Sequence, residues 1–172
     1  SGVGGSTYPA VNAAINRKLF TGTLFLNYVG HGGPIGLAKE RILTVDDISQ
    51  WNNATKLPLF ITATCEFAPY DAIGEYTAGE RVLFKEGGGG IALVTTTRVV
   101  YSNRNKTMND NFMAQMENAY SNEQMTLGDI VREAKKYDTI INYVAKERLD
   151  QMSETGKHQG VIAYAAAYEY AE

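Results

Sequence analysis

The chain has 172 residues, of which 44% are hydrophobic and 20% charged, as is usual for a folded globular protein. Its net charge is −3, and no basic stripe stands out, which argues against a nucleic-acid binder. The single cysteine excludes an intrachain disulfide, and no apolar run approaches the roughly 20 residues that a membrane helix needs.

The first half of the chain alternates helix and strand signals. A proline near the start and apolar residues at every fourth position predict a helix over 8–20. Residues 23–29 then predict a buried strand, and "TVDD" at 44–47 is a capping box that predicts a short helix through Trp51. "LPLFITATC" at 57–65 has the β-branched composition of a second buried strand.

The second half repeats this alternation. "TAGE" at 77–80 predicts a helix to about Glu86, and "IALVTTT" at 91–97 predicts a third buried strand. We expect a helix over roughly 105–120, followed by another that begins at the capping box "TLGD", 126–129. This order of elements predicts an α/β fold with a parallel sheet and right-handed crossovers.

Two chemically useful residues follow two of the predicted strands. His31 stands between glycines just after the first strand, and Cys65 closes the second. Open parallel sheets bind ligands beyond the carboxyl ends of their strands, so neighbouring strands would bring both side chains to one edge. A thiolate is a strong nucleophile, and a nearby imidazole can activate it or protonate a leaving amine. The pattern therefore predicts Cys65 as nucleophile and His31 as general acid and base.

Acyl transfer also needs N–H groups directed at the developing oxyanion. Gly32 can present its amide without a side chain in the way, and the amide of Cys65 is the natural second donor. Gly30 and Gly33 serve the tight turn.

Other interpretations of these residues are weaker. A lone cysteine is most often a small core residue, and a lone His-Gly is most often a loop. Here, however, the histidine and the cysteine each stand at the end of an apolar strand, and one crossover joins the two strands. This combination favours catalysis. A zinc site is a poor alternative, because His31, Cys65 and His158 lack ligand spacing. "GHGGPIG" fits neither the dinucleotide fingerprint nor the Walker pattern.

Several blocks of the chain resemble the gingipain family of caspase-like cysteine peptidases, and within it the sortase-type signal peptidases of the type IX secretion system. The blocks include "NYVGHGG", "RIL", "LPLFITATCEF", "AGE" and "TTTRVVYS". They occupy 27–33, 41–43, 57–67, 78–80 and 95–102, and the resemblance covers roughly residues 9 to 135.

The resemblance implies a three-layer α/β/α caspase-like sandwich with a mostly parallel sheet, incomplete at the amino-terminal side. It also implies His31 as catalytic histidine, Cys65 as nucleophile, and the Gly32 and Cys65 amides as oxyanion donors, with no metal or cofactor. The end of the third strand lies where such folds line the substrate pocket. Glu66, Thr97 and Arg98 are thus candidate substrate-binding residues, although Glu66 could simply face solvent. Arg98 could bind a carboxylate group or form a structural ion pair with Glu80.

The most similar members remove the carboxyl-terminal sorting domain of secreted cargo at the cell surface. They then help transfer the new carboxyl end to an anionic lipopolysaccharide. This chemistry uses one thioester and two acceptors, water or an amine. The resemblance therefore implies cargo proteins and other secretion components as partners, and an exported protein at the outer membrane. Two alternatives remain open, a secreted endopeptidase that cuts after basic residues and a non-catalytic surface module.

The two ends of the chain depart from this pattern. Residues 1–9 lack a charged region followed by an apolar core, so they do not predict a signal peptide, and we expect the chain to begin inside a larger protein. We expect one domain over 1–172, with a divergent tail over 137–172. The tail predicts a helix to about Met152, a loop that contains His158, and an alanine- and tyrosine-rich segment.

Overall fold

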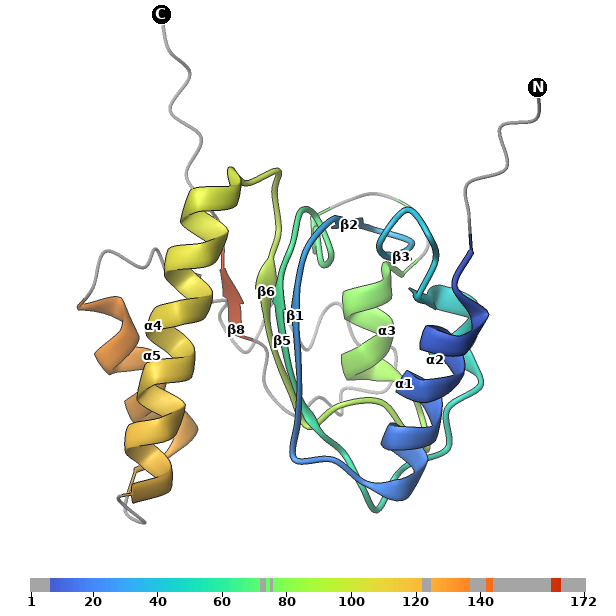
Figure 1. Ribbon diagram of the computed structural model, residues 1–172, viewed down its shortest axis with the longest axis horizontal. Helices are drawn as coiled ribbons and strands as arrows, with labels where there is room; N and C mark the ends of the chain where they lie inside the picture. Colours follow the sequence, from blue (N-terminus) through green and yellow to red (C-terminus); the bar gives the residue numbers. More distant parts are fainter. Residues whose placement is uncertain are drawn as a thin grey trace, which may run out of the picture.

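A computed structural model gives the structure of the chain (Figure 1). It describes residues 7–71, 74, 76–121 and 125–136, without the side chain of residue 135, and the backbone alone of 142–143 and 162–164. The helices are α1 (Pro9–Thr21), α2 (Val45–Ser49), α3 (Ala78–Phe84), α4 (Ser102–Ser121) and α5 (Leu127–Lys135). Each of the predicted helices up to residue 135 is present, with ends that differ by a few residues.

All three predicted capping boxes are confirmed. At the starts of α2, α3 and α5, a threonine hydroxyl accepts the N–H of the third helical residue, and that residue's carboxylate accepts the threonine N–H. The helix starts are thereby fixed by reciprocal bonds that satisfy backbone donors without a helical partner. The caps are Thr44, Thr77 and Thr126.

Three parallel strands form the middle of the fold, as predicted. β1 (Phe25–Val29) pairs with β5 (Leu59–Ala63), and β5 pairs with β6 (Ala92–Thr96). Two short strands continue the sheet beyond β6, a parallel β8 (Ile162–Tyr164) and an antiparallel β7 (Asn142–Tyr143). The order across the sheet is β1-β5-β6-β8-β7, which makes β1 one edge.

The structure differs from the sequence expectations in two places. The tight turn expected around Gly30 and Gly33 leads into a small antiparallel sheet, which the sequence patterns did not predict, of β2 (Gly32–Gly33), β3 (Gly36–Leu37) and β4 (Leu43–Thr44). The helix expected to reach Met152 is wrong at Asn142 and Tyr143, because these residues form β7 and pair with β8. Apart from β7 and β8, the residues of the predicted tail, His158 included, lie outside the described residues.

Side chains of the central strands alternate between two apolar cores. Phe60 and Leu93 point to the core that α1, α2 and α3 cover, whereas Ile61 and Val94 point to the core under α4 and α5. Figure 1 shows these two groups of helices on opposite sides of the sheet. Both faces of β5 and β6 are buried, which explains why the sequences of these strands are nearly continuous apolar runs.

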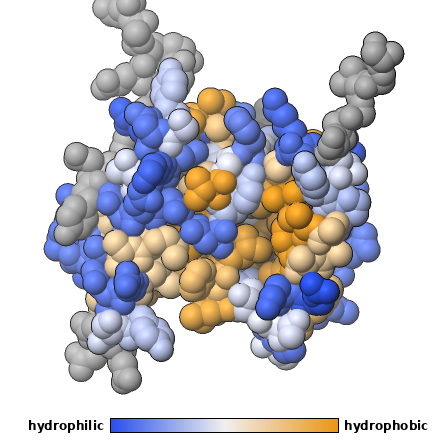
Figure 2. Space-filling view, in the orientation of Figure 1, coloured by the Kyte–Doolittle hydropathy of each residue, from blue (hydrophilic) through white to orange (hydrophobic). Residues whose placement is uncertain are grey.

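The edge strand β1 is less well covered. Its residues alternate between exposed and half-buried, and Val29 is 54% exposed. Apolar surface gathers over β1 between α4 and α1 in Figure 2. Within the described part of the chain, no helix is both long and apolar enough to cross a bilayer.

Candidate active site

The register of β1 against β5 places His31 and Cys65 at the same end of the sheet. Val29 is the last residue of β1 and pairs with Ala63, the last residue of β5. Gly30 extends the ladder by donating its N–H to the Ala63 carbonyl at 3.2 Å. His31 and Cys65 each stand two residues beyond the last pair, so they leave the same end of two adjacent parallel strands. The predicted meeting of these residues at one sheet edge is therefore supported by the strand order.

His31 is held by its backbone and presents its side chain outward. Its carbonyl accepts the Ala38 N–H at 2.7 Å and the Tyr28 hydroxyl at 2.7 Å. Burial and, secondarily, the charge of Glu40 raise the pKa of Tyr28, so this hydroxyl stays protonated as the donor. The residue as a whole is exposed, and its imidazole makes no hydrogen bond with any other described residue. The ring is thus free to meet a reacting group.

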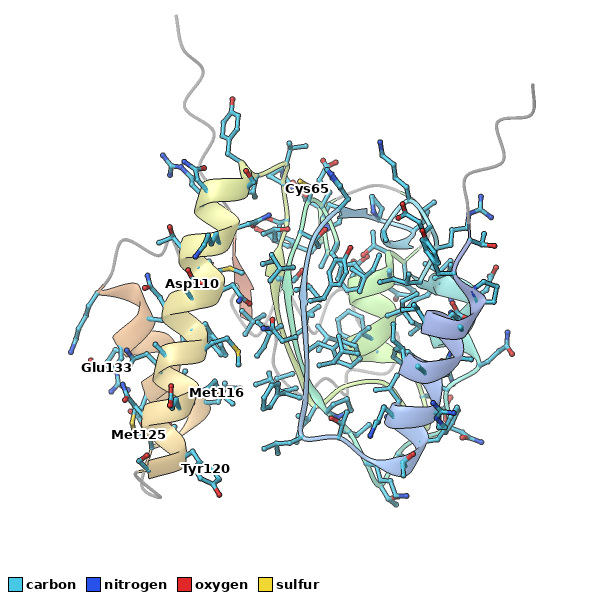
Figure 3. The ribbon with its side chains drawn as sticks, viewed as in Figure 1. Cys65, Asp110, Met116, Tyr120, Met125 and Glu133 are labelled. Carbon is cyan, nitrogen blue, oxygen red and sulfur yellow. The ribbon has the colours of Figure 1, made fainter. Side chains whose placement is uncertain are left out.

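Cys65 lies at the same end of the sheet, far from Tyr120 and Met125 (Figure 3). It is half-buried, and its thiol donates to the Val100 carbonyl with Sγ at 3.6 Å from the oxygen. This contact comes from the segment that joins β6 to α4. The thiol and the His31 ring are not hydrogen-bonded to each other, as is common before substrate binds. The residue thus keeps part of its surface exposed to solvent.

A sharp turn follows Cys65. Glu66 has a φ of 44°, in the left-handed region that side chains other than glycine rarely adopt. Two bonds hold this turn against the end of β6, from the Glu66 N–H to the Arg98 carbonyl and from the Ala68 N–H to the Thr96 carbonyl, both at 3.3 Å. The turn carries the chain away from the sheet directly after Cys65.

Gly32 lies against the residue that precedes Cys65. A Cβ on Gly32 would stand 2.4 Å from Thr64 Oγ1, so only glycine permits this approach. Gly32 opposes Leu37 in the β2–β3 ladder, and the neighbouring pair His31 and Ala38 carries the hydrogen bond. Because bonded and non-bonded pairs alternate in an antiparallel ladder, the Gly32 N–H points away from β3.

The candidate substrate-binding residues have different environments. Glu66 is half-buried beside Cys65, whereas Thr97 is only 1% exposed and belongs to the core. Arg98 is exposed and forms a two-point ion pair with Asp71, which raises the pKa of Arg98. The expected partner Glu80 is instead bound within its own capping box at the start of α3. A structural ion pair is present, but with a different partner.

Sequence patterns missed a buried polar cluster behind Cys65. The Thr64 carbonyl accepts hydrogen bonds from Thr96 Oγ1 at 2.5 Å and from Asn105 Nδ2 at 3.0 Å. Asn105 belongs to α4, 41 positions further along the chain. The only available signal was an amide among residues expected on a helix, which does not reveal what the amide contacts.

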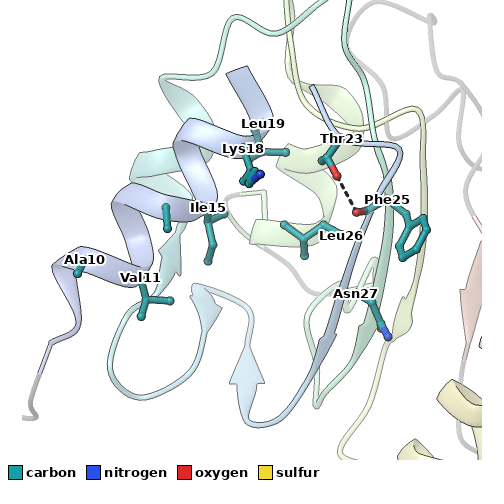
Figure 4. Close-up of a pocket in the computed structure, with 10 residues that line it drawn as sticks. Ala10, Val11, Ile15, Lys18, Leu19, Thr23, Phe25, Leu26 and Asn27 are labelled. Carbon is teal, nitrogen blue, oxygen red and sulfur yellow. Dashed lines mark hydrogen bonds between the residues drawn. The ribbon is translucent and has the colours of Figure 1, made fainter. Parts of the chain in front are cut away.

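Two open grooves run along β1, away from this site. One, of about 540 Å³, lies between α1 and β1 and is lined by Val11, Ile15 and Leu26 among others (Figure 4). The other, of about 750 Å³, lies between β1 and α4. Neither is lined by His31 or Cys65. The described residues include no group of three or more His, Cys, Asp or Glu side chains placed to hold a metal ion.

Comparison with known families gives one match over most of the chain. The sequence profile of the family described as "Peptidase family C25" matches residues 1–160. This match extends further than the 9–135 that the sequence blocks suggested.

Known structures and curated proteins give two further similarities. The fold is similar to that of the Arg specific cysteine proteinase gingipain R, with a TM-score of 0.64 and 16% sequence identity. That alignment covers 93% of this chain and 35% of gingipain R. A 43-residue segment is 56% identical to "Putative TrmH family tRNA/rRNA methyltransferase YacO" of Bacillus subtilis (strain 168), over 25% of this chain and 17% of that protein. So short a segment assigns no activity to the whole chain.

Proposed function

Because this chain belongs to peptidase family C25, a family of cysteine peptidases, we propose that it carries a catalytic pair formed by His31 and Cys65. The observation that supports the proposal most directly is the β1–β5 register, which places both residues two positions past paired strand ends. Helices on both faces of the parallel sheet support assigning the fold to the caspase-like α/β/α sandwich.

In the proposed mechanism the Cys65 thiolate attacks the carbonyl carbon of a peptide bond. A carbon–sulfur bond forms, and the carbonyl electron pair moves onto oxygen. When this oxyanion collapses, the C–N bond breaks and His31 gives a proton to the leaving amine. The resulting thioester is then attacked by water or by an amine, which His31 deprotonates, and the Cys65 thiolate is released.

Two backbone amides are proposed as the oxyanion donors. The Gly32 N–H is not used by the β2–β3 ladder, and the Cys65 N–H has no acceptor among the described residues. Both lie at the end of the sheet where the thiol is found. Fixed N–H groups stabilise a developing negative charge without having to reorganise during the reaction. Glu66 and Arg98 border this position and are proposed to contact substrate, whereas Thr97 is buried and is not proposed for this role.

The pH dependence of Cys65 alkylation tests the catalytic pair. The chain has one thiol, so iodoacetamide reports on Cys65 alone. We expect His31→Gln to move the alkylation profile to higher pH, because the imidazolium no longer stabilises the thiolate. The second histidine provides the matched control, and His158→Gln should leave the profile unchanged. A thiol that reacts only after unfolding, or a profile unaffected by His31→Gln, would contradict the pair and favour a non-catalytic module.

For the biological role we propose a type IX secretion sortase similar to PorU. The resemblance in the blocks around His31 and Cys65 supports this assignment, which includes export to the cell surface and cargo proteins with carboxyl-terminal sorting domains as substrates. The test is to incubate the full-length protein with such a cargo and to identify the new carboxyl end by mass spectrometry. Release of the sorting domain, with an added amine captured at the new end, is the expected result.

The alternative is an endopeptidase that cuts after basic residues. A basic side chain would need an unpaired carboxylate in the pocket. Asp71 is already paired with Arg98, which leaves Glu66, beside Cys65, as the carboxylate that this alternative would use. Cleavage of arginyl or lysyl peptides in preference to the cargo would overturn the sortase proposal and favour this alternative.

A further inference from the structure

The Thr64 carbonyl is held on both of its lone pairs by buried side chains. Thr96 Oγ1 donates to it at 2.5 Å, and Asn105 Nδ2 donates at 3.0 Å. Thr64, Thr96 and Asn105 are 0%, 2% and 7% exposed, so water does not compete for these bonds. A carbonyl oxygen has two lone pairs, and here both are occupied from the β6 and α4 side of the site.

This arrangement fixes the direction of the next N–H. The peptide unit between Thr64 and Cys65 is planar and trans, so its C=O and N–H point in opposite directions. Anchoring the carbonyl in the interior therefore directs the Cys65 N–H away from Thr96 and Asn105. The same N–H has no acceptor in the described part of the chain. It is thus both oriented and unused.

Asn105 is not explained by packing alone. Its Oδ1 is buried without a hydrogen-bond partner in the described part of the chain, which reduces stability. A leucine at this position of α4 would fill similar space without burying an unpaired oxygen. What the asparagine provides, and leucine cannot, is the Nδ2 donor to the Thr64 carbonyl.

We propose that Asn105, together with Thr96, is a positioning residue for acyl transfer, because it holds the Thr64–Cys65 peptide with its N–H directed at the oxyanion. The inference rests on the proposed role of Cys65 as nucleophile. Asn105 touches neither substrate nor the reacting atoms. It acts through the Thr64–Cys65 peptide unit, so a side chain of α4 influences the reaction at the end of β5.

The test compares two reactions of the same thiol. With p-nitrophenyl acetate, Sγ bonds to the acetyl carbon, an oxyanion forms, and the C–O bond then breaks to release p-nitrophenolate. With iodoacetamide, Sγ bonds to the methylene carbon and iodide leaves, so no oxyanion forms. A residue that orients an oxyanion donor should affect the first reaction and not the second, whereas a residue that only maintains the fold around Cys65 should affect both.

The variants are Asn105→Leu and Thr96→Val, which each remove one donor to the Thr64 carbonyl. Asn109→Leu is the matched control, since Asn109 lies one turn along α4, also has a buried Oδ1 without a partner, and does not bond to Thr64. We expect Asn105→Leu to slow acylation of Cys65 roughly tenfold or more, in line with the loss of an oxyanion donor. Alkylation should proceed at the wild-type rate, and Asn109→Leu should change neither rate.

Each outcome decides the proposal. Slower acylation with unchanged alkylation supports it. Equal losses in both reactions, or no loss in either variant, overturn it while leaving Cys65 as nucleophile. A wild-type thiol that neither acylates nor alkylates in the folded protein overturns the proposed function itself. If circular dichroism shows that Asn105→Leu does not fold, Thr96→Val carries the same comparison alone.

Discussion

Gly32 meets two separate requirements at the residue scale. Its missing side chain lets β2 approach Thr64, and its N–H is left unused by the β2–β3 ladder. The first requirement is steric and follows from the fold. The second concerns the proposed chemistry, so a substitution here changes both stability and acyl transfer.

Gly32→Ala should destabilise the protein by about 1–3 kcal/mol, as overpacking of a filled site does. The added methyl would stand 2.4 Å from Thr64 Oγ1 and 3.3 Å from the Gly36 carbonyl oxygen. Chemical denaturation measures the loss. Gly33→Ala is the control, because a Cβ there meets nothing within 4 Å. Equal stability of the two variants would show that the approach to Thr64 is not as close as described.

Some residues of the site could be predicted from the sequence, and others could not. His31 and Cys65 were visible because each follows an apolar strand, and parallel strand ends share one edge. Asn105 was not, because its contact with Thr64 depends on how α4 packs over the sheet. The Arg98 partner was also missed, since separation along the chain gives no rule for choosing Asp71, which lies 27 positions away, over Glu80.

At the scale of elements, local signals predicted the helix starts well. A capping box involves four consecutive residues and needs no tertiary contact, so "TVDD", "TAGE" and "TLGD" each marked a helix start correctly. The small sheet of β2, β3 and β4 was missed because each strand has two residues, too few for a period of two to appear.

The capping box of α5 predicts a pH effect. Hydrogen bonds from Thr126, and then the Arg132 charge, lower the pKa of Asp129 below its ordinary value. A group whose pKa is lower in the folded state stabilises that state above its unfolded pKa, and the contribution is lost as pH falls through the folded pKa.

Asp129→Asn should therefore reduce the free energy of unfolding at neutral pH, and the difference from wild type should disappear in acid. Thermal or urea unfolding followed from neutral pH to below the ordinary aspartate pKa measures this difference. Asp110→Asn is the control, because Asp110 is an exposed aspartate of α4 that pairs with Lys106 but belongs to no capping box. A difference that persists unchanged in acid would show that the carboxylate charge is not what stabilises the α5 start.

At the scale of the whole molecule, the uneven cover of the sheet is the main feature. β5 and β6 are buried on both faces, whereas β1 is an edge with apolar side chains in contact with solvent. Val29, at the end of β1, is 54% exposed, and Leu24, directly before the strand, is 77% exposed. Exposed apolar edge strands pair with other chains, so this edge makes the isolated chain prone to self-association.

Val29→Lys should reduce that association, because a charge on an edge strand opposes pairing with another edge. Static light scattering over a range of protein concentrations measures the effect. Val29→Thr keeps a β-branched residue without charge and separates the charge from the loss of apolar surface. The stability of the monomer should change little in either variant, since the side chain is more exposed than buried. Unchanged scattering in Val29→Lys would indicate association through another surface.

The pairing of β1 with β5 also gives the protein a built-in reporter of its own folding. His31 and Cys65 are 34 positions apart in the chain and reach the same end of the sheet only when this long-range parallel ladder closes. Local helices form earlier than such contacts, because closing a long loop costs conformational entropy before the contacts of the ladder can stabilise the chain. If His31 activates Cys65 as proposed, a short pulse of alkylating reagent during refolding should first find an activated thiol when the sheet closes.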